Sequence, residues 1–153
     1  MFDTGQPAPD FTMPQEGGDP VTLSELAPAP VVLFFYPRDD TSGCTKEAVA
    51  FSERLQEFTD AGIKVFGVSK DTLTSHARFR AKHDLTVPLL SDSETDTCER
   101  YGVWVEKRMY GKTYMGIERS TVLIGRDGEI ARVWRKVKVA GHVEEVLAAA
   151  SDL

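Results

Sequence analysis

The sequence predicts a central mixed β-sheet flanked by helices, in an α/β or α+β sandwich, and we favour the α/β class. Two continuous apolar runs, at 31–36 and 63–69, are typical of strands that are covered on both faces. An amphipathic helix is expected between them at 44–58, and a strand–turn–strand pattern at 119–134 precedes a last helix. This order, βαβα followed by ββα, favours helices packed in layers on a sheet.

The N-terminal segment at 5–23 is expected to form an extended arm and a small β-hairpin. Its sequence, GQPAPDFTMPQEGGDPVTL, contains the run GGDP at 17–20, which predicts the hairpin turn. The first central strand, VVLFFY at 31–36, follows. Pro37 ends this strand because proline has no backbone N–H to donate.

The clearest helix of the sequence begins just after this strand. Its apolar positions recur at steps of four and three and form one stripe: Cys44, Ala48, Phe51, Leu55 and Phe58. Ser42 is the expected N-cap, since a serine oxygen can accept from a free N–H of the first turn. Gly62 is expected to close the helix.

Weaker patterns follow the second strand. We expect a helix over 73–83, a short strand entered at 88–90, and a short helix within 93–101 that stops at Gly102.

The C-terminal third predicts a β-hairpin and an amphipathic helix. The runs RSTVLI at 119–124 and IARVW at 130–134 flank GRDG, whose Asp-Gly pair predicts a tight turn. The helix at 141–150, GHVEEVLAAA, has its apolar side chains on one face.

Composition limits the classes of function. The 153 residues fit a single domain, 1–153, with 41% hydrophobic and 27% charged residues. The net charge of −6 and the lack of a basic stripe disfavour nucleic acid and anionic membranes as partners. Met1 to Pro9 lack the apolar core of a secretory signal, and no apolar run has the length of a membrane span, so we expect a cytoplasmic protein.

No metal site or cofactor is expected from the side-chain pattern. His76, His83 and His142 are scattered among polar residues without carboxylates or cysteines at ligand spacing. The pair Asp39-Asp40 follows a buried strand, as in some magnesium sites, but a solvated loop is the favoured interpretation.

The two cysteines, Cys44 and Cys98, form neither a disulfide framework nor a zinc signature. Cys44 lies in the first turn of its predicted helix, where free N–H groups and the helix dipole favour an anion. Thiols at such positions have pKa values of roughly 3.5–7.5 instead of about 8.5, so we expect a thiolate nucleophile. The alternative is a small core residue at the top of the apolar stripe.

The neighbours of Cys44 favour the chemical interpretation. Thr41 offers a hydroxyl that can donate to sulfur and accept from a substrate. Pro37 can shield a thiolate from water without offering an N–H, and Glu47 lies one turn further on the same helix face, where it can bind a cation.

These residues carry a resemblance to a known family. Pro37-x-x-x-Thr41-x-x-Cys44 resembles the active-site motif of the peroxiredoxins, thiol peroxidases with a thioredoxin-like fold. The segments YPRDDTSGCTKEA, APDF, LLSD, YGVWVEK, MYGKTYMGIERSTVLI and GHVEEVL resemble the bacterioferritin comigratory protein (PrxQ) subfamily and span nearly the whole chain. The resemblance implies a thioredoxin-like fold with the N-terminal β-hairpin as an extension.

The resemblance also implies roles for individual residues. Cys44 would be the peroxidatic cysteine, which forms a sulfenic acid, and Thr41 would bond its thiolate and the peroxide oxygen. Pro37 would cover the pocket. Arg119, in IERST, would be the family's second-strand arginine, oriented by Glu47. The implied substrates are hydrogen peroxide and organic hydroperoxides, the implied reductant is thioredoxin, glutaredoxin or a low-molecular-weight thiol, and no cofactor is implied.

Two departures from the family pattern affect recycling and geometry. Many relatives carry a second cysteine five residues after the first, where this chain has Val49, which about 500° of helix rotation would turn roughly 140° from Cys44. Cys98 is then either a distant resolving cysteine or a buried helix residue. We favour the latter and hence a 1-Cys enzyme. Ser42 stands where the subfamily often has proline, which predicts a less rigid loop.

Two further questions stay open at this stage. A redox sensor or holdase-like binding protein with a poorly recycled Cys44 is the alternative to an enzyme. The subfamily that the chain resembles includes many monomers, so we expect a monomer. A dimer is the alternative, since no feature of the sequence selects firmly between the two states.

Overall fold

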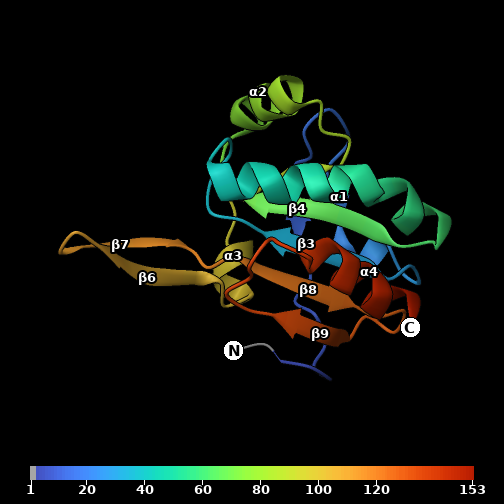
Figure 1. Cartoon of the computed structure of the whole chain (residues 1–153). Helices are drawn as coiled ribbons and strands as arrows, with labels where there is room; N and C mark the ends of the chain where they lie inside the picture. Colours follow the sequence, from blue (N-terminus) through green and yellow to red (C-terminus); the bar gives the residue numbers. More distant parts are fainter. Residues whose placement is uncertain (1–2) are drawn as a thin grey trace.

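The computed structural model describes residues 3–153, and a five-stranded mixed sheet forms its centre (Figure 1). The strands lie in the order β5-β4-β3-β8-β9. Their bounds are β3 Val31–Phe35, β4 Lys64–Ser69, β5 Leu89–Ser91, β8 Ser120–Ile124 and β9 Ile130–Trp134. β3, β4 and β5 are parallel, whereas β8 pairs antiparallel with both β3 and β9. The predicted mixed sheet with flanking helices is confirmed.

Both faces of the central strand β3 are buried, which explains its continuous apolar run. Val32 and Phe34 pack on one face beneath three helices, and Leu33 and Phe35 pack on the other. The three helices are α1 Ser42–Asp60, α2 Leu73–His83 and α4 His142–Ser151. A strand with side chains on alternate faces needs apolar residues at every position when each face is covered.

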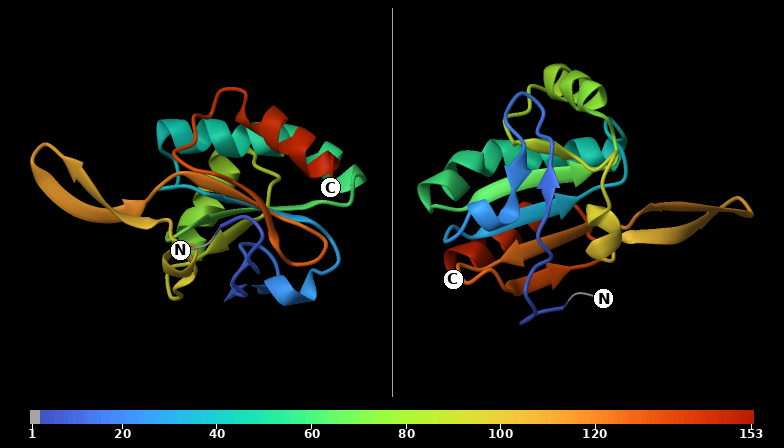
Figure 2. Two further views of the ribbon diagram at one scale, coloured as in Figure 1. Left: turned by 90° about the horizontal axis from the view of Figure 1, so that it is seen from below. Right: turned by 180° about the vertical axis from the view of Figure 1, so that it is seen from behind.

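The N-terminal arm and the short helix α3 (Thr97–Arg100) cover the second face. The arm contains β1 (Thr12–Met13) and β2 (Val21–Thr22), which pair antiparallel as the predicted small hairpin, and a 3₁₀ turn at Leu23–Glu25. Figure 2 shows this arm lying across the back of the sheet. The N-terminal hairpin is therefore confirmed as a cover for the core.

A second hairpin, β6 (Trp104–Met109) with β7 (Lys112–Ile117), projects away from the sheet (Figures 1 and 2). The sequence analysis assigned no element here. Most of its side chains are exposed or half-buried, and Tyr110 at its tip is 97% exposed. Only the base of the hairpin reaches the core, through Trp104 and Ile117. The rest of the ribbon covers no core, so it does not need the apolar alternation by which a strand is recognised.

The helix boundaries differ from expectation in two places. The N-cap of α1 is Thr41, in extended conformation, and not Ser42, which begins the helix. The short helix predicted within 93–101 is limited to four residues, 97–100. The predicted helix over 73–83 and the closure of α1 near Gly62 agree with the structure. No helix within residues 3–153 is both long and apolar enough to cross a membrane.

Candidate active site

Cys44 lies in the first turn of α1, directly after the loop 37–41 that leaves β3. Its side chain is 1% exposed. The guanidinium of Arg119 donates from Nη2 to Cys44 Sγ at 3.2 Å. A permanent positive charge and the free N–H end of a helix therefore meet at one sulfur.

Strand register explains how Arg119 reaches a cysteine so far away in the sequence. β3 and β8 are antiparallel, and Phe35, the last residue of β3, pairs with Ser120, the first residue of β8. Arg119 immediately precedes Ser120. Arg119 therefore lies at the end of the strands where the chain leaves β3 and continues into α1.

Glu47 holds the other side of the same guanidinium. Its Oε1 accepts from Arg119 Nη1 at 2.8 Å, and its side chain is fully buried. Its second oxygen, Oε2, has no hydrogen-bond partner within residues 3–153. Burial raises the pKa of Glu47 to about 7, against the opposing attraction of Arg119. Burial of Arg119 disfavours its charged form, but Glu47 and Cys44 favour that form more strongly, so the pKa of Arg119 is raised.

Gly43 is a contributor that the sequence analysis missed. A Cβ atom at this position would lie 3.1 Å from Arg119 Nη2, closer than side chains normally approach. Gly43 therefore gives the guanidinium the room it needs beside Cys44. The proximity of Arg119 was the only signal for this role, and it is visible only in three dimensions.

Pro37 and Thr41 stand at the mouth of the site. Thr41 is exposed, and its Oγ1 donates to the carbonyl oxygen of Arg38 at 3.0 Å. No hydrogen bond joins Thr41 to Cys44 among the described residues, so the contact expected between them is not formed in this state. Pro37 and Thr41 both line a cleft of about 580 Å³, which is also lined by Trp104 and Lys107 of the β6–β7 hairpin.

Comparison with known proteins decides the family of this site. The model of the AhpC/TSA family matches residues 4–133. The chain belongs to the AhpC/TSA family. Peroxiredoxin Bcp of Xanthomonas campestris is 47% identical over 94% of this chain and 91% of its own length, and Peroxiredoxin Bcp of Bacillus subtilis is 42% identical over 99% and 97%.

Solved structures place the chain among the peroxiredoxins of the Bcp (PrxQ) type. Peroxiredoxin Q of Xanthomonas campestris superimposes with a TM-score of 0.90 at 43% identity, and the match covers 97% of each chain. A structure of the bacterioferritin comigratory protein of the same organism, which concerns alkyl peroxide reduction, has the same TM-score and identity over 98% of each chain. The resemblance drawn from the motif is therefore confirmed, together with the thioredoxin-like fold.

The second cysteine of this peroxiredoxin lies on the far side of the sheet. Cys98 belongs to the core beneath the N-terminal arm, whereas Cys44 belongs to the core beneath α1 and α4. Both cysteines are free, and Cys98 is fully buried. Its backbone N–H donates to Asp92 Oδ2 at 2.8 Å. Burial, together with the charge of Asp92, raises the pKa of the Cys98 thiol far above its usual range.

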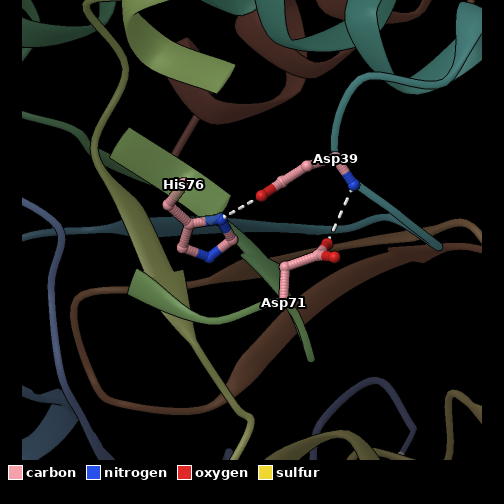
Figure 3. A group of neighbouring side chains, drawn as sticks. All are labelled: Asp39, Asp71 and His76. Carbon is pink, nitrogen blue, oxygen red and sulfur yellow. Dashed lines mark hydrogen bonds and ion pairs between the residues drawn. The ribbon is translucent and has the colours of Figure 1, made fainter. Parts of the chain in front are cut away.

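The predicted polar, solvated surroundings of Asp39, His76 and His142 were wrong. Asp39 does not lie in a solvated loop, because it is buried and bonded to His76, as Figure 3 shows. His76 and His142 are buried as well, because α2 and α4 turn them toward the sheet. Their surroundings are therefore not polar surface, whereas Asp40 is exposed as expected.

One group of side chains in the peroxiredoxin has the composition of a metal site. The ligand atoms of Asp39, Asp71 and His76 lie within 4.8 Å of one another (Figure 3). Asp39 accepts from Tyr36 and Ser75, and Asp71 accepts from Ser69 and from the backbone N–H of Asp39. Protein donors already occupy these oxygens, so the group is a hydrogen-bond network that fits no metal without rearrangement.

Proposed function

We propose that this peroxiredoxin reduces hydrogen peroxide and organic hydroperoxides with Cys44 as the peroxidatic nucleophile. The contact between Arg119 Nη2 and Cys44 Sγ, 3.2 Å long in the first turn of α1, carries this proposal. A thiolate is the reactive form of cysteine, and a fixed guanidinium favours the thiolate. The family of the chain supports a peroxide as the substrate.

The proposed reaction is a two-electron transfer from sulfur to the peroxide. The Cys44 thiolate attacks the terminal oxygen of ROOH, an S–O bond forms, and the O–O bond breaks. The leaving RO⁻ takes a proton to become ROH, and Cys44 is left as a sulfenic acid. Negative charge moves from sulfur to the leaving oxygen, so a charge fixed near both atoms lowers the barrier.

The proposed roles of the other residues follow from their positions. Arg119 lies between Cys44 and Glu47, and its planar fork can bond the sulfur and the peroxide oxygen while Glu47 holds it in place. The Thr41 hydroxyl donates to a backbone carbonyl and keeps its lone pairs for the peroxide proton. Pro37 narrows access from the cleft to the thiolate.

For recycling we propose a 1-Cys cycle with an external thiol such as thioredoxin, glutaredoxin or a low-molecular-weight thiol. The thiol attacks the sulfenic acid, water leaves, and a mixed disulfide forms. A second thiol then releases Cys44 as a thiol and leaves as the oxidised disulfide. The position of Cys98 on the other face of the sheet supports an external reductant over a Cys44–Cys98 disulfide.

We also propose that the chain acts as one domain, as a monomer and in the cytoplasm. The continuous sheet shared by strands from 31 to 134 supports a single folding unit. A chemistry that depends on a free thiol fits a reducing compartment. Light scattering of the purified chain checks the oligomeric state, and a stable dimer would contradict this part.

Two measurements test the function. Steady-state peroxide consumption with a thioredoxin system should cycle many times per chain, whereas a single burst would support the redox-sensor alternative. Mass spectrometry after one equivalent of peroxide should show a sulfenic acid at Cys44, trapped by dimedone. A product lighter by two hydrogen atoms, with Cys44 linked to Cys98, would overturn the 1-Cys cycle.

A further inference from the structure

Helix α2 fastens the loop 37–41 through a buried carboxylate. Asp39, at the centre of the loop, is 9% exposed. Its Oδ1 accepts from the Tyr36 hydroxyl at 2.6 Å, and its Oδ2 accepts from Ser75 Oγ at 2.7 Å. His76 Nδ1 lies 2.8 Å from the same Oδ2, as drawn in Figure 3. The backbone N–H of Asp39 donates to Asp71 Oδ2 at 2.8 Å.

Each ring nitrogen of His76 faces an oxygen atom that can accept a hydrogen bond. Its Nε2 lies 2.9 Å from the carbonyl oxygen of Leu90, which can only accept, so Nε2 carries a proton. On the other side, Asp39 already accepts from two hydroxyls, as an ionised carboxylate does. Although burial opposes ionisation, the hydrogen bonds from His76 and its neighbours hold the pKa of Asp39 below its usual range. Oδ2 of Asp39 lies beside Nδ1 as a second acceptor, and an imidazolium is the form of the ring that donates from both nitrogens.

We propose that protonated His76 is a positioning residue for the Cys44 site, and that its buried ion pair with Asp39 holds the loop 37–41 against α2. The proposal rests on the peroxidase function proposed above. Pro37 and Thr41 are the two ends of this loop, and Cys44 follows within one helical turn. A shift of Asp39 therefore moves both residues at the mouth of the site.

The backbone of the loop explains why such a clamp is needed. Asp40 has a φ of +60°, a left-handed conformation that is uncommon for residues other than glycine. Surrounding contacts must hold a residue in this region, because it costs free energy. Ser42, the first residue of α1, has no ring that would fix its φ, so it adds no stiffness of its own. The buried pair at Asp39 supplies the restraint from outside the loop.

A second, exposed contact between the same loop and α2 serves as a control for the buried ion pair of His76 and Asp39. Asp40, next to Asp39, also bonds to α2, through Lys82 Nζ and His83 Nε2, each at 2.7 Å. These contacts are exposed to solvent, with the Asp40 side chain 40% accessible, whereas the His76 side chain is 0% accessible. Exposed ion pairs contribute little, while removal of one partner of a buried pair leaves an uncompensated charge.

The first experiment observes the charge of His76 directly. Nitrogen-15 NMR of the wild-type protein at neutral pH should show two protonated ring nitrogens for His76, assigned by their loss in His76→Gln. A single protonated nitrogen would overturn the proposal, whatever the activity of any variant.

The second experiment measures positioning. In His76→Gln we expect the rate constant of Cys44 with hydrogen peroxide to fall by about tenfold or more, because small displacements of reacting groups are costly. The rate with iodoacetamide, which needs only the thiolate, should fall much less. His83→Gln should leave both rates within about twofold of wild type. Urea unfolding of each variant identifies conditions in which all chains are folded.

A double variant separates the ion pair from the packing. Asp39→Asn and His76→Gln each leave one buried charge, whereas the combined variant leaves none, so its loss in peroxide rate should be smaller than the product of the two single losses. Equal peroxide rates for His76→Gln and His83→Gln would overturn the clamp while leaving the peroxidase function intact. A wild-type protein without peroxidase activity would instead refute the proposed function.

Discussion

The two cysteines are buried alike, but they differ in the charged group to which each residue is hydrogen-bonded. Cys44 is 1% exposed and Cys98 is 0% exposed. Cys44 receives a hydrogen bond from the guanidinium of Arg119, whereas the backbone of Cys98 binds the carboxylate of Asp92, which opposes a thiolate. Accessibility alone would not distinguish the two sulfurs. Their neighbours are the reason that we propose a reactive role for Cys44 and a structural role for Cys98.

The elements that carry the cysteines differ in the same direction. Cys44 lies in the first turn of a 19-residue helix whose N-cap, Thr41, makes no side-chain cap hydrogen bond. Cys98 lies in the four-residue helix α3, where Asp92 accepts the backbone N–H groups of both Thr97 and Cys98. At α3 the Asp92 side chain binds the N–H groups of the helix start, whereas at α1 the Thr41 side chain does not bind them.

Substitution of each cysteine in turn should produce the largest difference in peroxidase activity. Cys44→Ser is expected to abolish peroxide consumption, since a serine hydroxyl is not ionised at neutral pH. Cys98→Ala should retain a rate within about twofold of wild type, at a stability cost of about 1 kcal/mol for the lost sulfur. A coupled thioredoxin assay and urea unfolding measure the two effects. Equal loss of activity in both variants would remove the distinction between the cysteines.

Removal of the positive charge should bring Cys44 closer to the behaviour of Cys98. In Arg119→Met we expect the peroxide rate constant to fall by roughly 10²–10³-fold, as for loss of other fixed groups that stabilise developing charge. Arg119→Lys should recover only part of this loss, because an ammonium cannot bond sulfur and carboxylate with a planar fork. Stopped-flow measurements at one pH compare the peroxide rate constants of the wild type and the two variants. A lysine variant as fast as wild type would contradict a need for the fork.

Displacement of the guanidinium without removing it should have a smaller effect. Gly43→Ala places a Cβ about where Arg119 Nη2 needs space, 3.1 Å away, so the arginine must shift. We expect a decrease of about tenfold in the peroxide rate constant with little change in stability. Gly62→Ala at the far end of α1 is not a matched control, because Gly62 has a φ of +77°. Ala48→Gly tests general weakening of the helix instead, and equal losses in Gly43→Ala and Ala48→Gly would argue against displacement of Arg119.

Titration of Glu47 should have the smallest effect on rate. Its pKa is raised to about 7 by burial, so the carboxylate that orients Arg119 is present above this pH and protonated below it. We expect the peroxide rate constant to decline a few-fold between about pH 8 and pH 6, and this step should be missing in Glu47→Gln.

The effect of Glu47 on the free energy of unfolding has the opposite dependence on pH. Because the pKa is higher in the folded chain than in the unfolded chain, the free energy of unfolding should fall as pH rises from 4.5 through 7. An unchanged step in Glu47→Gln would assign it to another group.

The sequence could predict what depends on local pattern. The apolar runs at 31–36 and 63–69 became β3 and β4, and the stripe from Cys44 to Phe58 became the buried side of α1. Pro37, Thr41 and Cys44 lie within eight residues, so their proximity follows from the chain itself. Periodicity and short spacing are properties of the letters, and they carried these predictions.

The remaining contacts depend on tertiary structure, and the letters do not contain them. Arg119 was identified only through a resemblance, because a charged residue before a strand has no pattern that points to Cys44. Gly43 acquires its importance from a guanidinium 76 positions away in the chain. The bond of His76 to Asp39 needs α2 to pack over the loop, and this packing turned a residue expected at the surface into a buried one.

The register of β3 against β8 makes the reactive centre a late product of folding. Before these two strands pair, Cys44 and Arg119 are distant points on a flexible chain, and the sulfur has no counter-ion. A slip of one residue would turn the side chains of β8 to the opposite face and withdraw the guanidinium. Newly synthesised and misfolded chains would therefore carry an ordinary, slow thiol, and sensitivity to peroxide would be confined to molecules whose sheet has closed correctly.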